Sequence, residues 1–229
     1  RSVIVMPTNA NPVKLAGVKS FGGQVELVGT LSSQREARAG QLAREEGMVN
    51  IHPYADPYVA AGQGTIGLEI VADLPDAAAV AAPIGGGGLI SGVAFAIKQL
   101  NPNIKVYGVQ ASGAPSMYES IHNDKITCLD SVSTIADGIA VKEPGPHTFE
   151  YVKQYVDEIV TVTDDEISAA ILSLIEKNGD LFIRKRIKIL IDKMVHIQSL
   201  SEKIPACIIS AWERNCNLFD FFLQIKYNT

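Results

Sequence analysis

Short apolar runs alternate along the chain with segments whose apolar residues recur at helical spacing. A short apolar run predicts a buried strand, and apolar residues three and four positions apart predict a helix. The expected strands cover residues 2–6, 25–28, 49–52, 79–84, 104–109 and 158–162. The expected helices cover residues 12–21, 34–46, 57–73, 89–100, 115–123, 146–156 and 164–177. This alternation is typical of an α/β fold in which helices cover both faces of a mostly parallel sheet.

The ends of several helices carry their own signals. Asp56 before Pro57 predicts a capped helix start, because proline suits the first helical turn. Gly47 predicts the end of the helix before it. The carboxylates of residues 164–166 suit the positive end of the last helix, so a helix-start cap explains them better than a catalytic pair.

Four consecutive glycines, Gly85 to Gly88, separate an expected strand from an expected helix. Glycines let the backbone approach a ligand closely, and the N–H groups of the turn and of the first helical turn can point at one anion. The simpler interpretation is a tight or flexible turn, which needs only one or two glycines. The pattern is neither a P-loop nor a dinucleotide fingerprint, so it indicates a phosphate group without naming the molecule that carries it.

Composition narrows the class of protein. A chain of 229 residues with 47% hydrophobic residues can bury a substantial core, and a net charge of −5 argues against a nucleic-acid or anionic-membrane partner. The three cysteines are widely spaced, which argues against disulfides and zinc and favours a reducing cytoplasm. The chain contains no run of about 18 apolar residues, so no membrane span is expected.

Three segments resemble threonine dehydratases, which are also called threonine ammonia-lyases and belong to the fold-type-II pyridoxal-phosphate enzymes. They are 61–69 (AGQGTIGLE), 83–92 (PIGGGGLISG) and 134–141 (TIADGIAV). Segments 3–7 (VIVMP), 51–54 (IHPY) and 155–162 (YVDEIVTV) match in the same order, so the resemblance covers about residues 2–178. Together these segments are specific for the threonine/serine dehydratase and serine racemase group.

The resemblance implies a three-layer, tryptophan-synthase-β-like fold. It implies an incomplete small domain at residues 1–46 and a large domain, also incomplete, that binds pyridoxal 5′-phosphate at residues 47–178. Gly85, Gly86, Gly87, Gly88 and Leu89 then surround the cofactor phosphate, and Gly138 lies beside the cofactor ring. The family's reaction converts L-threonine, or serine, to a 2-oxo acid and ammonia. We expect a small amino-acid substrate and a homo-oligomer.

One departure from the family concerns the catalytic lysine. The family's Schiff-base lysine lies in a Ser-Phe-Lys motif, and a Ser-x-Gly-Asn-His loop holds the substrate carboxylate; this chain contains neither motif. Lys14, Lys19, Lys98 and Lys105 are predicted to be solvated charges rather than substitutes. We therefore expect no catalytic residue in this chain and a start that lies inside the small domain, after both motifs.

A second departure begins at residue 179. All 19 glycines lie at or before Gly179, and residues 181–229 carry eight Lys or Arg against four Asp or Glu, so 179–229 is predicted to be a divergent tail. One hypothesis is a shifted reading frame or a mispredicted gene end, which a continuous frame in the sequenced transcript would contradict. The rival is a replacement segment with a helix near 182–203, where apolar residues have helical spacing; a membrane-surface or partner role for it is a minor alternative.

Several other residues have two interpretations. We expect His52 to be a structural histidine, Glu69 to be a buried hydrogen-bonding group and Cys128 to be an inert thiol. Some relatives bind a cation through an acidic pair at the positions of Gln110 and Ser116. Both residues are uncharged here, which argues against a divalent metal and leaves open a monovalent ion held by backbone carbonyls.

Two functional hypotheses follow. The first is a pyridoxal-phosphate-dependent threonine or serine dehydratase, with serine racemase as the close alternative; Ala140-Val141 after Asp137-Gly138 favours the dehydratase. The second is a non-catalytic truncated or frame-shifted fragment that binds only phosphate or a partner subunit.

Overall fold

The computed structural model describes residues 1–178, which group into one unit from Arg1 to Ile51 and a second that begins at His52. The helix expected near 182–203 lies outside these residues. Every predicted helix and all but one predicted strand form within two residues of their expected ends. No helix in the described part of the chain is long and apolar enough to cross a bilayer.

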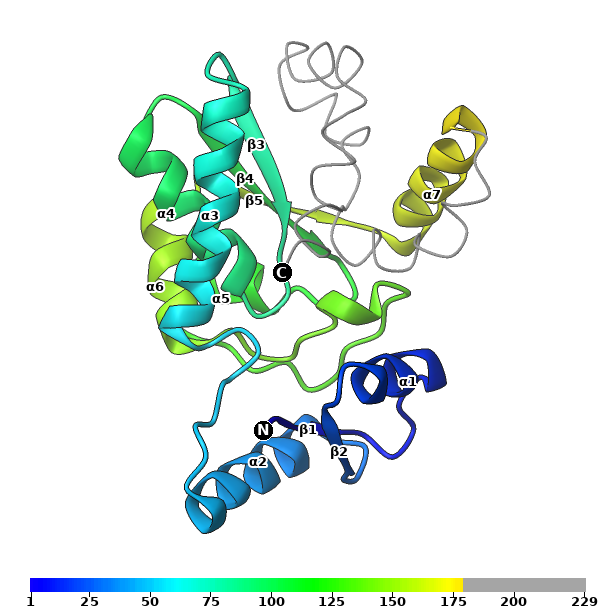
Figure 1. Ribbon diagram of the computed structural model, residues 1–229. Coiled ribbons are helices and arrows are strands. Elements are labelled where there is room, and N and C mark those ends of the chain that lie inside the picture. Colours follow the sequence, from blue (N-terminus) through cyan, green and yellow to red (C-terminus); the bar gives the residue numbers. More distant parts are fainter. Residues whose placement is uncertain (179–229) are drawn as a thin grey trace. The chain divides into compact units, whose positions relative to one another are not determined.

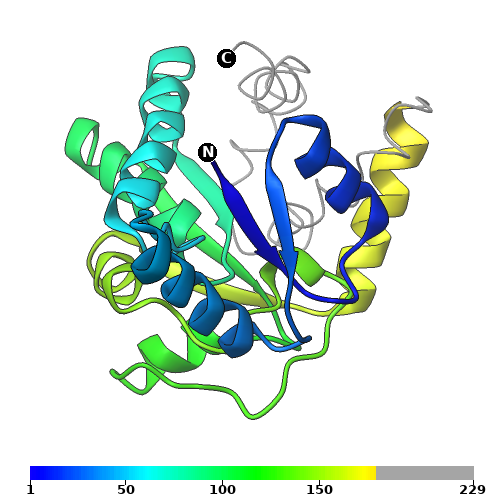
Figure 2. The same cartoon turned by 60° about the horizontal axis from the view of Figure 1, so that its bottom comes forward.

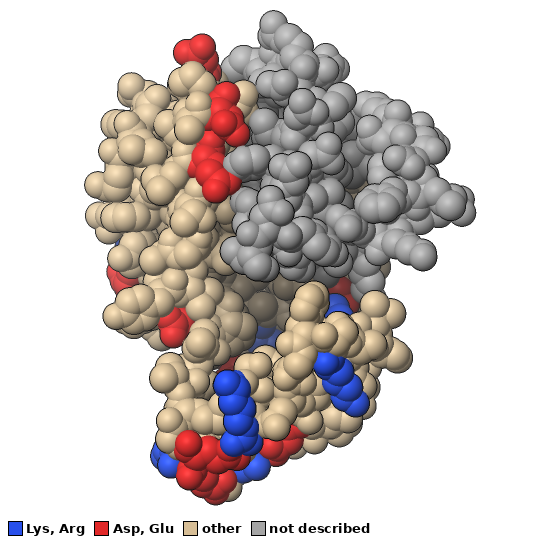
Figure 3. All heavy atoms as spheres, viewed as in Figure 1, with Lys and Arg blue, Asp and Glu red and all other residues tan. Residues whose placement is uncertain are grey.

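The first unit is a two-stranded parallel sheet with two helices. Strand β1 (Val3–Met6) pairs with β2 (Gln24–Leu27), and α1 (Pro12–Ser20) and α2 (Ser32–Glu46) flank the strands (Figure 2). Charges of both signs mix on its surface (Figure 3). Arg38 on α2 pairs with Glu26 at 2.5 Å and with Glu45 at 3.3 Å.

The second unit is built on a three-stranded parallel sheet with the order β3-β4-β5. These strands are β3 (Ala79–Pro83), β4 (Lys105–Ala111) and β5 (Glu158–Val162). The helices are α3 (Pro57–Asp73), α4 (Gly88–Leu100), α5 (Ser116–His122), α6 (Pro146–Tyr155) and α7 (Asp164–Asn178), and Asp137–Ile139 forms a short 3₁₀ turn. The prediction of an α/β fold with parallel sheets is confirmed.

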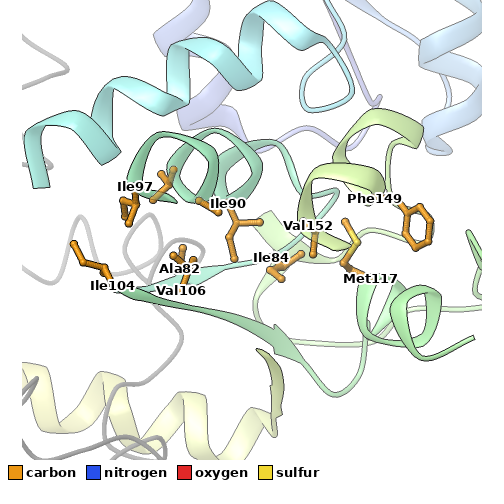
Figure 4. Packing of buried hydrophobic residues seen from close by; sticks show 11 residues of the cluster. Ala82, Ile84, Ile90, Ile97, Ile104, Val106, Met117, Phe149 and Val152 are labelled. Carbon is orange, nitrogen blue, oxygen red and sulfur yellow. The ribbon is translucent and has the colours of Figure 1, made fainter. Parts of the chain in front are cut away.

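Each face of this sheet has its own hydrophobic core, because alternate residues of a strand point to opposite faces. On one face Val106 packs with residues of α4, α5 and α6, among them Ile90, Met117 and Phe149 (Figure 4). On the other face Val109 and Val162 pack with Ile167 of α7. In Figure 1, α3, α4 and α6 accordingly lie on one side of the strands and α7 on the other.

Helices α3 and α4 pack closely because glycines line their contact. A Cβ on Gly92 would overlap the Ala60 carbonyl oxygen, and one on Gly67 would lie 2.8 Å from the Val93 carbonyl oxygen. Gly64 and Gly67 belong to segment 61–69, so this segment serves helix packing. The contact joins Ala60, in the first turn of α3, to Gly92, the fifth residue of α4.

The strand predicted at 49–52 is wrong. These residues form no regular element, and Val49 and Ile51 are 85% and 65% exposed. An apolar run becomes a strand only where a neighbouring strand accepts its hydrogen bonds, and no strand of the described residues pairs with this segment. The segment instead connects the two units.

Candidate anion-binding site

The glycine loop lies at the carboxyl end of β3, where ligands of parallel sheets bind. The loop leaves the sheet after Ile84, whose N–H donates to the Val109 carbonyl at 2.8 Å. It ends at Gly87, the N-cap of α4, whose φ of 95° lies in the left-handed region that favours glycine. The strand, four-glycine turn and helix predicted from the sequence are therefore present.

The loop presents a row of backbone donors. Within residues 1–178, no oxygen accepts a hydrogen bond from the N–H groups of residues 85–90. Gly86, Gly87, Gly88 and Ile90 are also buried. A buried N–H group without an acceptor costs free energy, and the positive end of the α4 dipole adds to their pull on a negative charge. The site is therefore chemically suited to an anion with several acceptor oxygens, such as a phosphate group.

Side chains from three other segments surround the loop and leave no room for a side chain on it. A Cβ on Gly86 would overlap the Tyr54 ring, and one on Gly87 would lie 2.6 Å from the Met117 methyl carbon and 2.8 Å from Thr148 Cβ. Tyr54 reaches across the loop, where its hydroxyl donates to the Glu143 carbonyl at 3.3 Å. Gly88 is equally constrained, because a Cβ there would lie 2.9 Å from Tyr54 Cα, whereas a Cβ on Gly85 would be tight, at 3.1 Å from Ile139 Cα.

The sequence pattern indicates no role for Tyr54, Met117 or Thr148. Tyr54 was part of a matching segment, which was a usable signal. Met117 and Thr148 had no signal, because their positions beside the loop depend on the packing of α5 and α6.

Segment 134–141 forms the remaining wall. The Ile139 Cα would lie 3.1 Å from a Cβ on Gly85, so the 3₁₀ turn that contains Gly138 lies against the glycine loop. Asp164 anchors the segment, because its carboxylate accepts from Thr134 Oγ1 at 2.5 Å and from the Ile135 N–H at 3.1 Å. This corrects the interpretation of Asp164 as a cap.

Glu166 performs the capping predicted for residues 164–166. Its carboxylate accepts from the Thr163 N–H at 2.7 Å, and Thr163 Oγ1 accepts from the Glu166 N–H at 3.2 Å. These two reciprocal bonds form a capping box at the start of α7.

The prediction that Lys98 is solvated is wrong. Its side chain is 14% exposed and pairs with Asp157 at 2.7 Å, and its Nζ donates to the Ile104 carbonyl at 2.8 Å. Lys98 lies ten residues beyond Gly88 on α4, about 15 Å along the helix. Lys105, 58% exposed, pairs with the same carboxylate at 2.9 Å. Neither lysine is placed to act at the glycine loop.

The remaining candidates have structural surroundings. His52 Nδ1 accepts from the Ala55 N–H at 3.0 Å, as expected for a structural histidine. Glu69 is half-buried on α3, and its buried Oε2 has no hydrogen-bond partner among the described residues, so the hydrogen bond expected of it is not formed there. A hydrogen bond to Glu143 raises the pKa of the exposed Cys128 thiol, which disfavours the reactive thiolate.

Gln110 and Ser116 are fully buried beside the start of α5. Gln110 Oε1 accepts from the Tyr118 N–H at 2.9 Å, while Gln110 Nε2 and Ser116 Oγ have no hydrogen-bond partner among the residues that the structure describes. In the described part of the chain, no three His, Cys, Asp or Glu side chains gather as a metal site requires.

Comparison with known proteins decides the family. The sequence profile described as "Pyridoxal-phosphate dependent enzyme" matches residues 1–181. The chain belongs to this family. The family's cofactor is pyridoxal phosphate, and its phosphate group agrees with the buried donors of the glycine loop.

Three similar proteins illustrate the relationship. An L-threonine ammonia-lyase of Thermotoga maritima is 49% identical over 176 residues, which are 77% of this chain and 44% of that protein. The processed form of threonine deaminase isoform 2 from Solanum lycopersicum has a TM-score of 0.74 at 42% identity, over 78% of this chain and 49% of that one. Maize serine racemase has a TM-score of 0.73 at 37% identity, over 76% and 53%.

The chain spans about half the length of the curated relatives it matches. The matched segments end near residue 181, where the unusual composition begins.

Proposed function

We propose that the glycine loop binds the phosphate of pyridoxal phosphate through Gly85, Gly86, Gly87, Gly88 and Leu89, with Gly138 beside the cofactor ring. The row of buried backbone donors without acceptors is the observation that carries this proposal. The 3₁₀ turn against Gly85 supports the placement of Gly138. The chain's own contribution is to hold the phosphate and to exclude water from it, since Tyr54, Met117 and Thr148 close the loop on its outer side.

We propose that the whole protein is a threonine ammonia-lyase, which converts L-threonine to 2-oxobutanoate and ammonia. When bound, the cofactor supplies an electron sink for loss of the α-proton and the β-hydroxyl. Similarity to L-threonine ammonia-lyases supports this reaction over the racemisation suggested by the maize structure. A homo-oligomer in the cytoplasm with a small amino-acid substrate remains part of this proposal.

We infer that this chain by itself holds the cofactor without catalysing the reaction. In pyridoxal-phosphate enzymes a lysine amine forms the Schiff base with the cofactor. The motif that carries this lysine is not in the sequence, and Lys98 and Lys105 are engaged by Asp157. The chain therefore fits a fragment that binds the cofactor phosphate.

Equilibrium dialysis of the purified chain against pyridoxal phosphate, with inorganic phosphate as competitor, tests the loop. We expect phosphate-competed binding that Gly87→Ala weakens at least about tenfold, because the substitution strains φ and displaces the donors. Gly22→Ala is the matched control, since Gly22 has φ of 77° with open space around it, far from the loop in sequence. Equal loss in both variants, or binding that phosphate does not compete, would contradict the proposal.

Borohydride reduction of the chain with bound pyridoxal phosphate distinguishes a non-catalytic fragment from a chain that is an enzyme by itself. A fragment leaves the cofactor free after reduction, and a peptide map shows no modified lysine. Attachment to one lysine would mean that a substitute nucleophile exists and that the chain by itself is an enzyme.

A further inference from the structure

Thr148 is a buried hydroxyl residue in the first turn of α6, where it is 2% exposed. Its Oγ1 donates to the Gly86 carbonyl at 2.6 Å, and the Gly145 carbonyl lies 2.9 Å away. A hydroxyl has one proton to donate, so the shorter contact marks Gly86 as the main acceptor. Thr148 therefore links α6 directly to the glycine loop.

Two donors determine the direction of the Gly86 carbonyl. Besides Thr148 Oγ1, the Gly145 N–H donates to the same oxygen at 3.2 Å. In a planar trans peptide the carbonyl and the following N–H point in opposite directions. The N–H of Gly87 must then point away from Thr148, and it is one of the buried donors without an acceptor.

The same side chain also sets the shape of the loop. Thr148 Cβ and Oγ1 would lie 2.8 and 2.9 Å from a Cβ on Gly87, so the threonine side chain fits here only because residue 87 is glycine. Ser91 Oγ, in the first turn of α4, donates to the Thr148 carbonyl at 3.3 Å. Thr148 is thus held against both the loop and the helix that follows it.

We propose that Thr148 is a positioning residue for the bound phosphate, acting through the Gly86–Gly87 peptide without touching the ligand. This inference rests on the proposed function of the loop. The competing explanation is that Thr148 only closes the first turn of α6 through the Gly145 carbonyl.

Thr148→Val and Thr148→Ser separate the two explanations. Valine keeps the shape and loses the hydroxyl, and serine keeps the hydroxyl. We expect Thr148→Val to weaken the affinity for inorganic phosphate and for pyridoxal phosphate about tenfold, and Thr148→Ser to remain within about twofold of the unmodified chain.

Ser120→Ala is the control for general loss of a buried hydroxyl. Ser120 is fully buried, and its Oγ donates to the Ser116 carbonyl at 2.6 Å. Ser120→Ala should lower the melting temperature of the chain without changing its affinity for phosphate. Unchanged affinity in Thr148→Val, or an equal loss in Thr148→Ser, would overturn the proposal in favour of a packing role.

A ligand-free measurement keeps this inference separate from the proposed function. The ¹⁵N–¹H residual dipolar coupling of Gly87 reports the direction of its N–H bond. It should change in Thr148→Val and stay the same in Thr148→Ser and Ser120→Ala. If the unmodified chain binds neither phosphate nor pyridoxal phosphate, the proposed function fails, and this coupling alone decides whether Thr148 orients the loop.

Discussion

Asp157 lies just before β5, and its carboxylate links this segment to α4 and to β4. The Asp157 side chain is 21% exposed. It accepts from Lys98 on α4, from Lys105 at the start of β4 and from the Val106 N–H at 2.8 Å. Burial by itself raises the pKa of Asp157, but these hydrogen bonds outweigh it and lower the pKa from 3.8 to about 2. The ionised carboxylate of Asp157 is therefore the form that stabilises the fold.

A lowered pKa makes the contribution of Asp157 to stability pH-dependent. The contribution is complete above the unfolded pKa of 3.8 and is lost as the pH falls toward 2. Asp157→Asn should lower the free energy of unfolding by about 2 kcal/mol at pH 7 and by progressively less below pH 4. Urea unfolding between pH 7 and pH 3 measures both values.

Asp124→Asn is the control for this prediction. Asp124 pairs with Lys153 but its side chain is 70% exposed, and an exposed pair contributes little. Its replacement should change stability by less than about 0.5 kcal/mol. A destabilisation by Asp157→Asn that is the same at every pH would mean that shape, rather than charge, explains the effect.

At the scale of elements, the contact between α3 and α4 places the glycine loop. Gly64 and Gly67 of α3 face Gly92 and Val93 of α4, and the two backbones approach closely because no side chain separates them. Tyr54, just before α3, thereby lies on Gly86 and Gly88 at the start of α4. The segments 61–69 and 83–92 are two halves of one packing arrangement.

Gly92→Ala tests this contact. Its methyl group would overlap the Ala60 carbonyl oxygen, which belongs to the backbone and cannot move aside alone. We expect a loss of about 3 kcal/mol in the free energy of unfolding, measured by chemical denaturation. Gly62→Ala on the exposed side of α3 has open space and should stabilise the chain by about 0.5–1 kcal/mol. Equal effects of the two changes would rule out the close contact.

At the scale of the whole molecule, the two units differ in how much they bury. Leu42 is the only buried hydrophobic residue of the first unit, while Val13, Phe21 and Val49 are 79%, 90% and 85% exposed. The second unit has a buried core on each face of its sheet. A two-stranded sheet with so little core is marginally stable.

Native-state hydrogen exchange should therefore separate the units. Amides of β4 should exchange at least about a hundredfold more slowly than those of β1 and β2, because they open only with the core of the second unit. The strands serve as each other's reference within one sample. Comparable protection of Ile4 and Val106 would show that the first unit is stabilised as strongly as the second.

Local sequence patterns were sufficient to predict most of the helices and strands and to propose an anion-binding role for the glycine loop. The periods of apolar residues are local properties, so the helices and most strands could be predicted within two residues. Four glycines between a strand and a helix are also local, and they were sufficient to predict a loop for phosphate. The strand at 49–52 failed because strand formation requires a partner that no local pattern reveals.

The residues that complete the site come from distant parts of the chain and could not be predicted from local patterns. Thr148 lies 62 positions from Gly86, and Asp164 lies 30 positions from Thr134, yet each pair shares a hydrogen bond. Lys98 likewise resembles an exposed charge until the fold brings Asp157 to it. Such pairings depend on how whole elements pack against one another. Local sequence patterns do not show which distant residues come into contact.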